Sequence, residues 1–223
     1  SKITKKFWTI QKKIVLLQRI NKKNMKYVYF RMALVALLFF GGFQSLLANT
    51  NEVMVRCIAF YNLENVFDTI HDEGKNDYEY LPDGGMKWTS LKYKNKIQNM
   101  AYAISQLGTD EDPRGAACVG VSEVENIGCL EDLCRELKEK HNRNYVPMLL
   151  EGPDRRGIDV GFLYNPDMFK PVGQPKGYEL KAHYADGGVV RSRLQLWISG
   201  YLLDDNRKIV MDKIHISVNH WPS

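Results

Sequence analysis

Three residues that can handle a metal ion and a phosphate stand directly after apolar, strand-like runs. Asn62 follows VMVRCIAFY, Glu123 comes after AACVGVS, and His220 closes the last such run. Because functional sites in layered α/β proteins form at the carboxyl ends of strands, these side chains are expected at one edge of a sheet. A carboxylate there suits Mg²⁺, which takes one or two protein carboxylates plus waters and phosphate oxygens. A histidine beside it can protonate a leaving group or stabilise a phosphoryl oxygen.

Each of these residues also has an ordinary structural interpretation. An asparagine after a strand commonly forms a turn, a glutamate at a strand end can face solvent, and a lone histidine before Trp-Pro can simply be packed. Their joint position at the ends of three strands favours the chemical interpretation.

The elements that would position these residues follow from the spacing of apolar side chains. Buried strands are predicted at 53–61, 116–121, 145–150 and 159–164, and longer strands at 194–203 and 208–219, joined by a hairpin turn at 204–207. Helices are predicted at 91–107, ended by Gly108, and around 130–137. The polar stretch 65–90 predicts a long loop, a kind of segment that is often functional.

This order of elements predicts a layered α/β or α+β domain and excludes an all-α bundle. The first two crossovers favour a parallel pair of strands with helices packed on the sheet. The four cysteines, Cys57, Cys118, Cys129 and Cys134, match neither a zinc pattern nor a disulfide scaffold. Cys57 and Cys118 are expected close together and reduced, because adjacent parallel strands rarely meet disulfide geometry.

The net charge of +5 comes from the amino-terminal segment. Ten of the 31 Lys and Arg residues lie in 1–48, which has no Asp or Glu, so 49–223 carries 21 basic and 26 acidic side chains. The folded part is therefore mildly acidic, and its net charge gives no support for nonspecific binding to polyanions. A hydrophobic content of 44% provides for a globular core and excludes a disordered or low-complexity chain.

The amino-terminal segment predicts export. A short apolar run at 32–43 follows Lys26 and Arg31 and precedes Ala48, which is typical of a signal peptide over 25–48. The run is too short for a comfortable membrane span. Residues 1–24 are interpreted as sequence upstream of the natural start at Met25; the alternative is a basic amphipathic helix lying on a membrane. We expect a secreted or periplasmic monomer with no stable membrane span after cleavage.

Four segments resemble the endonuclease/exonuclease/phosphatase superfamily, whose fold is that of deoxyribonuclease I. They are FYNLENVFD (60–68), VSEVEN (121–126), RRGIDVGFLY (155–164) and VNHWPS (218–223), and they occur in the family's order from residue 53 to the end. The resemblance implies a layered α/β sandwich of two mixed β-sheets flanked by helices. It also implies cleavage of phosphoester bonds by an activated water, with Mg²⁺ or Mn²⁺ as cofactor.

The resemblance assigns roles position by position. Glu123 matches the metal-binding glutamate, Asn62 the asparagine that arranges metal and phosphate, and His220 the histidine at the scissile phosphate. The weaker candidates are Asp159 for active-site hydrogen bonding, and Arg156 and Asn219 for substrate contacts. Glu125 and Asn126 are expected to support the loop or to cap the following helix.

The family's later motifs, G-D-x-N and a terminal Asp-His that supplies the general base, do not occur in this sequence. We therefore expect residues 49–223 to be the amino-terminal part of a longer domain, incomplete at its carboxyl end and nearly inactive as given. The leading functional prediction is an exported Mg²⁺-dependent phosphodiesterase, most simply an endonuclease acting on nucleic acid. The alternatives are a lipid or sugar phosphoesterase of the same fold and a non-catalytic binding module.

Overall fold

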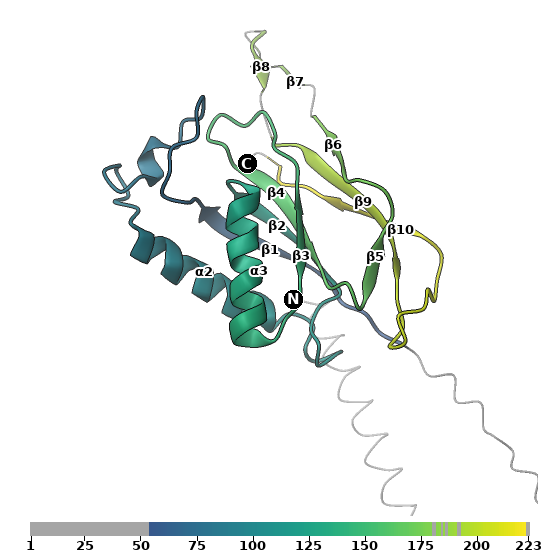
Figure 1. The fold of residues 1–223 in the computed structure, drawn as a ribbon. Coiled ribbons are helices and arrows are strands. Elements are labelled where there is room, and N and C mark those ends of the chain that lie inside the picture. Colours follow the sequence, from purple (N-terminus) through teal and green to yellow (C-terminus); the bar gives the residue numbers. More distant parts are fainter. Residues whose placement is uncertain (1–53, 180–181, 184, 186, 191–192, 222–223) are drawn as a thin grey trace, which may run out of the picture. The chain divides into compact units, whose positions relative to one another are not determined.

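The computed structural model describes residues 54–221, except for 180–181, 184, 186 and 191–192 (Figure 1). The predicted basic extension and signal peptide lie outside the described residues. Within the described part, no helix is both long and apolar enough to cross a membrane.

The first sheet contains four strands in the order β1-β2-β4-β3. These are β1 (Ile58–Val66), β2 (Cys118–Val124), β3 (Val146–Leu149) and β4 (Asp159–Tyr164). β1 and β2 are parallel, as predicted, whereas β4 runs antiparallel to both β2 and β3. The sheet is therefore mixed, and the carboxyl ends of β1 and β2 lie at one edge with the amino end of β4.

Two helices cover one face of this sheet, α2 (Ser90–Ser105) and α3 (Ile127–His141) (Figure 1). Their buried side chains, among them Ile104, Leu130 and Leu137, pack with sheet residues such as Val119 and Val121 in one core. α2 begins after Thr89, whose side chain accepts a hydrogen bond from Lys92 N. Such N-caps satisfy one of the free amide groups of the first helical turn.

The second sheet is antiparallel and packs on the opposite face of the first. Its order is β10-β9-β5, with β6 also paired to β9. The strands are β5 (Phe169–Pro171), β6 (Lys176–Tyr178), β9 (Gln195–Leu202) and β10 (Ile214–Val218). Phe162 of β4 and Phe169, Leu196 and Val218 of the second sheet bury their side chains in a common core. Short strands β7 (Ala182–His183) and β8 (Val189–Val190) pair with each other.

This two-sheet α/β sandwich confirms the predicted fold class, with the difference that the second sheet is antiparallel rather than mixed. The predicted helices and central strands are confirmed with small shifts at their ends. The predicted loop after β1 is confirmed too, and it holds a single 3-10 turn, η1 (Tyr78–Tyr80). Sequence patterns gave no indication of the short strands β5 to β8.

Two strand boundaries differ from the prediction. β1 continues through residues 62–65, of which all but Leu63 are polar, to Val66, because Leu63 and Val66 still turn into the core. The last strand is only Ile214–Val218 instead of 208–219. The reason is a wider turn, since the Asp204 carboxylate accepts hydrogen bonds from the amides of Asn206 and Lys208, both at 2.8 Å.

All four cysteines are free thiols. Cys57 and Cys118 lie on neighbouring strand ends, where Ala117 N donates to Cys57 O at 2.8 Å. Burial raises the pKa of Cys118, so its thiol stays protonated and unreactive at neutral pH.

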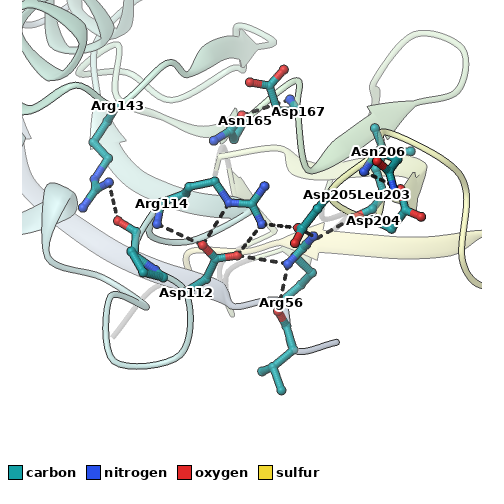
Figure 2. A network of polar contacts seen from close by, with 12 residues as sticks. Arg56, Asp112, Arg114, Arg143, Asn165, Asp167, Leu203, Asp204, Asp205 and Asn206 are labelled. Carbon is teal, nitrogen blue, oxygen red and sulfur yellow. Dashed lines mark hydrogen bonds and ion pairs between the residues drawn. The ribbon is translucent and has the colours of Figure 1, made fainter. Parts of the chain in front are cut away.

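A network of ion pairs joins the two sheets at the amino ends of β1 and β2 (Figure 2). The buried Arg56 side chain donates to Asp112 Oδ2 (3.0 Å), Asp205 Oδ1 (2.7 Å) and Leu203 O (3.1 Å). Arg114 binds the same two carboxylates. Because Asp205 lies in the turn between β9 and β10, this network fastens the second sheet to the first at the edge opposite the strand ends that carry Glu123.

Candidate active site

Glu123 is the extra residue of a bulge at the end of β2. Ser122 and Val124 pair with Val160 and Asp159, which are consecutive in β4, so Glu123 has no partner there. Its φ of 61° is left-handed, which is uncommon for a residue with a side chain. Bulges next to active sites re-aim side chains, and here the Glu123 carboxylate is directed toward the second sheet.

His220 reaches the same point from the second sheet. It follows β10, whose last residue, Val218, packs over Gly120 of β2: a Cβ at Gly120 would lie 3.0 Å from Val218 Cγ2. The missing side chain of Gly120 therefore lets the two sheets approach. The result is a distance of 3.3 Å between His220 Nε2 and Glu123 Oε1, with both side chains mostly buried.

The surroundings of His220 keep its imidazole neutral. Burial is the main cause of its lowered pKa, and Arg193 and Arg156 add to the effect. Glu123 and Asp154 oppose it. His220 Nδ1 is buried and has no hydrogen-bond partner within the described part of the chain. A neutral histidine with one bare nitrogen can accept or donate a proton near pH 7.

The other predicted residues lie around this pair at differing depths. Asn62 pairs with Ser122 in the register of β1 and β2 and is exposed. Asp159 is fully buried beneath the bulge, where its Oδ1 accepts from Gly152 N at 3.0 Å. Burial raises the pKa of Asp159 to about 6. Asn219 adjoins His220, and its Oδ1 is buried without a hydrogen-bond partner among the described residues.

Arg156 lies on the loop between β3 and β4, with a half-exposed side chain. Its positive charge acts electrostatically on His220 and on Tyr80 of η1. The charge of Glu123 also acts on Tyr80, so the loop after β1 borders the same site. That loop is tied to the β3–β4 loop by Asn76 N, which donates to Arg155 O at 2.7 Å.

Glu125 and Asn126 have the supporting roles expected of them. Glu125 Oε2 accepts from Asp68 N at 2.7 Å, and Asn126 caps α3 through Cys129 N at 3.0 Å. Asp68, Glu125 and Cys129 have ligand atoms within 4.8 Å of one another, as a metal site requires. However, Asn126 Nδ2 already donates to Asp68, and burial raises the pKa of Glu125 to about 8. We therefore interpret this cluster as the support of the loop after β1.

The donor set around Glu123 fits a hard divalent cation. Glu123 offers a carboxylate that no backbone amide holds within the described residues. The exposed Asn62 lies one residue away in register; its Oδ1 accepts a hydrogen bond from Glu64 N at 2.8 Å and keeps a second lone pair for a cation. Mg²⁺ commonly binds through one or two such oxygens and keeps several waters. When bound, the metal would neutralise charge on a phosphoryl group and lower the pKa of a water.

The sequence matches a family model described as "Endonuclease/Exonuclease/phosphatase family" over residues 57–223, well over half of the chain. The chain belongs to the endonuclease/exonuclease/phosphatase family. Members of this family are generally hydrolases of phosphoester bonds and typically use divalent metals. The resemblance noted in the sequence is thereby confirmed.

Two solved structures similar to this family member are a family protein from Bacteroides thetaiotaomicron and a conserved protein of unknown function from Enterococcus faecalis. The first shares 15% identity and a TM-score of 0.39 over 67% of this chain and 44% of its own. The second shares 14% identity and a TM-score of 0.39 over 73% of this chain and 52% of its own. The chain thus spans about half the length of these structures. No curated protein matches it.

Sequence reasoning missed two residues of this family member's candidate site, Arg193 and Asp154. Arg193 precedes β9, and its Nε lies 3.3 Å from Asp154 Oδ2. The predicted hairpin of strands 194–203 and 208–219 could have indicated Arg193, because the start of the first strand lies beside the end of the second. A charged residue before 194–203 is therefore expected near His220. Asp154, inside a Gly-Pro-Asp loop, resembles an ordinary turn residue.

Proposed function

We propose that the full-length protein is an exported Mg²⁺-dependent phosphodiesterase whose metal is held by Glu123 and whose reacting phosphate lies beside His220. One observation carries the proposal. Glu123 and His220 are 97 positions apart in the sequence and lie on different sheets, yet their side chains are 3.3 Å apart. A carboxylate for the cation, a neutral imidazole for proton transfer and arginine charge close by are groups that phosphoester hydrolysis uses.

The residues would divide the work as follows. Glu123 binds the cation with Asn62 beside it, and Arg156 and Asn219 contact the substrate phosphate. His220 holds or transfers a proton at the leaving oxygen, for which a neutral imidazole is suited. Asp159 fixes the loop that carries Arg156, because its carboxylate accepts from Gly152 N at the start of that loop.

Nucleic acid is the substrate that we propose first, since a phosphodiester is the group that this constellation fits. A second candidate is a lipid or sugar phosphoester, and a specific observation favours it. The loop that borders the site has acidic residues at 68, 72, 73, 77, 79 and 83 and one lysine at 75 before residue 87. Asp77 is buried, but the other acidic side chains leave this loop negatively charged, and a negative loop repels a long polyanion more than a single phosphate group.

The test uses the full-length protein with Mg²⁺ or Mn²⁺ and with EDTA, on DNA, RNA, sphingomyelin and a bis-aryl phosphodiester. Glu123→Gln keeps the size and removes the charge, so we expect metal affinity and turnover to fall together. His220→Ala should lower turnover by about 10²–10⁴ with little effect on metal binding. Glu131→Gln and His183→Ala, both at exposed positions, are the matched controls.

Hydrolysis that persists in EDTA, or in Glu123→Gln at the wild-type rate, would refute the assignment. Phosphate binding without turnover of any substrate would instead indicate the non-catalytic binding module.

A further inference from the structure

Asp154 places a buried carboxylate between the two arginines of the site. Its Oδ2 lies 3.3 Å from Arg193 Nε, and both side chains are 11% exposed. Its Oδ1 accepts from the backbone amide of Arg156 at 2.9 Å and lies 3.9 Å from Arg156 Nε. One carboxylate therefore contacts both arginines whose charge reaches His220.

The Arg193 guanidinium has a donor left over. Its Nε is buried and has no hydrogen-bond partner within the described residues, although Asp154 is at ion-pair distance. The N–H is therefore not aimed at the carboxylate. Buried donors in native proteins are nearly always satisfied, so an unsatisfied one calls for an acceptor. The guanidinium fork matches the oxygens of a phosphate better than any other common group.

The balance of charges near His220 also indicates a site for a phosphate group. Two arginines, Arg156 and Arg193, face two carboxylates, Asp154 and Glu123. With Glu123 assigned to the metal, the two arginines keep one carboxylate between them. The two arginines and Asp154 then carry one net positive charge, to which the bound cation would add, and this charge attracts the anionic phosphodiester.

Resting on the proposed function, we propose that Asp154 is a positioning residue that holds the Arg193 guanidinium against the substrate phosphate. A largely buried arginine without a carboxylate partner would lose much of its electrostatic stabilisation and its fixed orientation. Asp154 supplies the charge partner at 3.3 Å, and this ion pair restricts where the guanidinium can lie, while the Nε donor is left for a phosphate oxygen.

The loop around Asp154 does not depend on its side chain alone. Lys75 Nζ donates to Gly152 O at 3.2 Å and to Asp154 O at 3.4 Å, and Gly157 N donates to Asp154 O at 3.2 Å. Asp154→Asn can keep the hydrogen bond from Arg156 N through its amide oxygen. This variant therefore removes the charge while most of the loop's ties remain.

Asp154→Asn separates two explanations that predict opposite results. It adds one unit of net positive charge to the site, so a purely electrostatic role predicts tighter binding of an anion. A positioning role predicts weaker binding, because Arg193 is released. Inorganic phosphate is the probe, titrated calorimetrically into the full-length protein with Mg²⁺. We expect its affinity to fall about tenfold, a typical effect for residues that orient a ligand-binding group, with Mg²⁺ affinity unchanged.

Kinetics on a bis-aryl phosphodiester give the second readout. kcat/KM should fall about 10²-fold, the cost of a small misplacement of a reacting group. Arg193→Lys keeps the charge but loses the fork, and Asp154 acts through Arg193. The double variant Asp154→Asn/Arg193→Lys should therefore bind phosphate no more weakly than Arg193→Lys alone. Asp167→Asn, which alters the exposed pair with Arg207, is the matched control.

Thermal melting shows whether each variant is folded. If Asp154→Asn is not, Asp154→Glu keeps the charge but shifts it by one methylene, and it should weaken phosphate binding less than tenfold. Tighter phosphate binding by Asp154→Asn, additive effects in the double variant, or a wild-type protein that binds no phosphate would each overturn the proposal. If Asp154→Asn weakens phosphate binding but no phosphoester is hydrolysed, the proposed function fails and the positioning role stands.

Discussion

Arg56 is the residue whose loss should most weaken the attachment between the two sheets. Its side chain is 4% exposed and donates to Asp112, Asp205 and the Leu203 carbonyl at 3.1 Å or less. Arg56→Met keeps much of the volume and removes all three donors. Removing one partner of a buried ion pair costs about 3–5 kcal/mol when the other charge is left alone.

Here the cost is expected at or below the lower end of that range. Asp112 keeps Arg114, which donates to both of its oxygens at 3.0 and 2.7 Å, and the Asp205 side chain is 75% exposed. We expect a loss of about 2–3 kcal/mol in the free energy of unfolding. For a domain of this size, that lowers Tm by about 5–10 °C. Urea unfolding and calorimetry of the full-length protein at pH 7 measure both.

The matched control is Arg207→Met, which breaks the exposed pair with Asp167 and should cost about 0–1 kcal/mol.

The pH dependence of unfolding gives a second test. The hydrogen bond from Arg114 is the main cause of the lowered pKa of Asp112, and Arg56 adds to it. A lowered carboxyl pKa stabilises the fold above the unfolded value of 3.8 and ceases to do so as pH falls through the folded value. The difference in free energy of unfolding between wild type and Arg56→Met should therefore become smaller below pH 3.8. A cost at pH 7 no larger than that of Arg207→Met would refute this reasoning.

Three further predictions concern the second sheet, the buried carboxyl group and the leader. Gly200→Ala puts a methyl group 2.2 Å from Phe169 Cζ and 2.7 Å from Lys170 O, so urea unfolding should show a loss of about 1–3 kcal/mol. Gly85→Ala, which meets only Glu79 Cγ at 3.6 Å, should be nearly neutral. The pKa of Asp159 rises from 3.8 in the unfolded chain to about 6 in the fold. Its protonated carboxyl group therefore stabilises the fold below pH 3.8, and this contribution of up to about 3 kcal/mol is lost as pH rises through 6. Asp159→Asn should remove that slope, and parallel pH profiles of the two proteins would contradict it. Amino-terminal sequencing of the exported protein should begin near Asn49, and retention of 32–43 would disprove cleavage there.

Local patterns were sufficient for the elements that bury continuous apolar runs. The central strand β2 is confirmed because it is a short run in which nearly every residue is buried, and helix α3 is confirmed because its buried residues follow helical spacing. The end of β1 was missed because Asn62, Glu64 and Asn65 have the composition of a turn. Pairing with β2 at Asn62 and Val66, on either side of an irregularity in the register, carries the strand through them, and a single segment does not reveal such pairing.

Contacts between distant segments were beyond such patterns. Arg114 and Asp205 are 91 residues apart and pair only once the two sheets are stacked. Asp154 and Arg193 likewise meet through tertiary packing. By contrast, Glu123 and His220 could be placed together from the sequence, because each lies where an apolar strand ends. The expectation that they share one sheet was wrong, since β2 and β10 belong to different sheets that are stacked on each other.

Backbone strain at the ends of the parallel strands β1 and β2 lowers the stability of the fold at residues that the proposed chemistry uses. Glu64, Asn65 and Glu123 have φ values of 55°, 62° and 61°, the region that glycine occupies without strain. Such conformations cost about 1–3 kcal/mol each for residues with a side chain. Glu123→Gly would therefore make the fold more stable while deleting the carboxylate assigned to the metal. Selection of variants for thermostability alone should therefore favour replacement of Glu123 and loss of the proposed metal site. A stabilised variant that is meant to stay active must keep residue 123 unchanged.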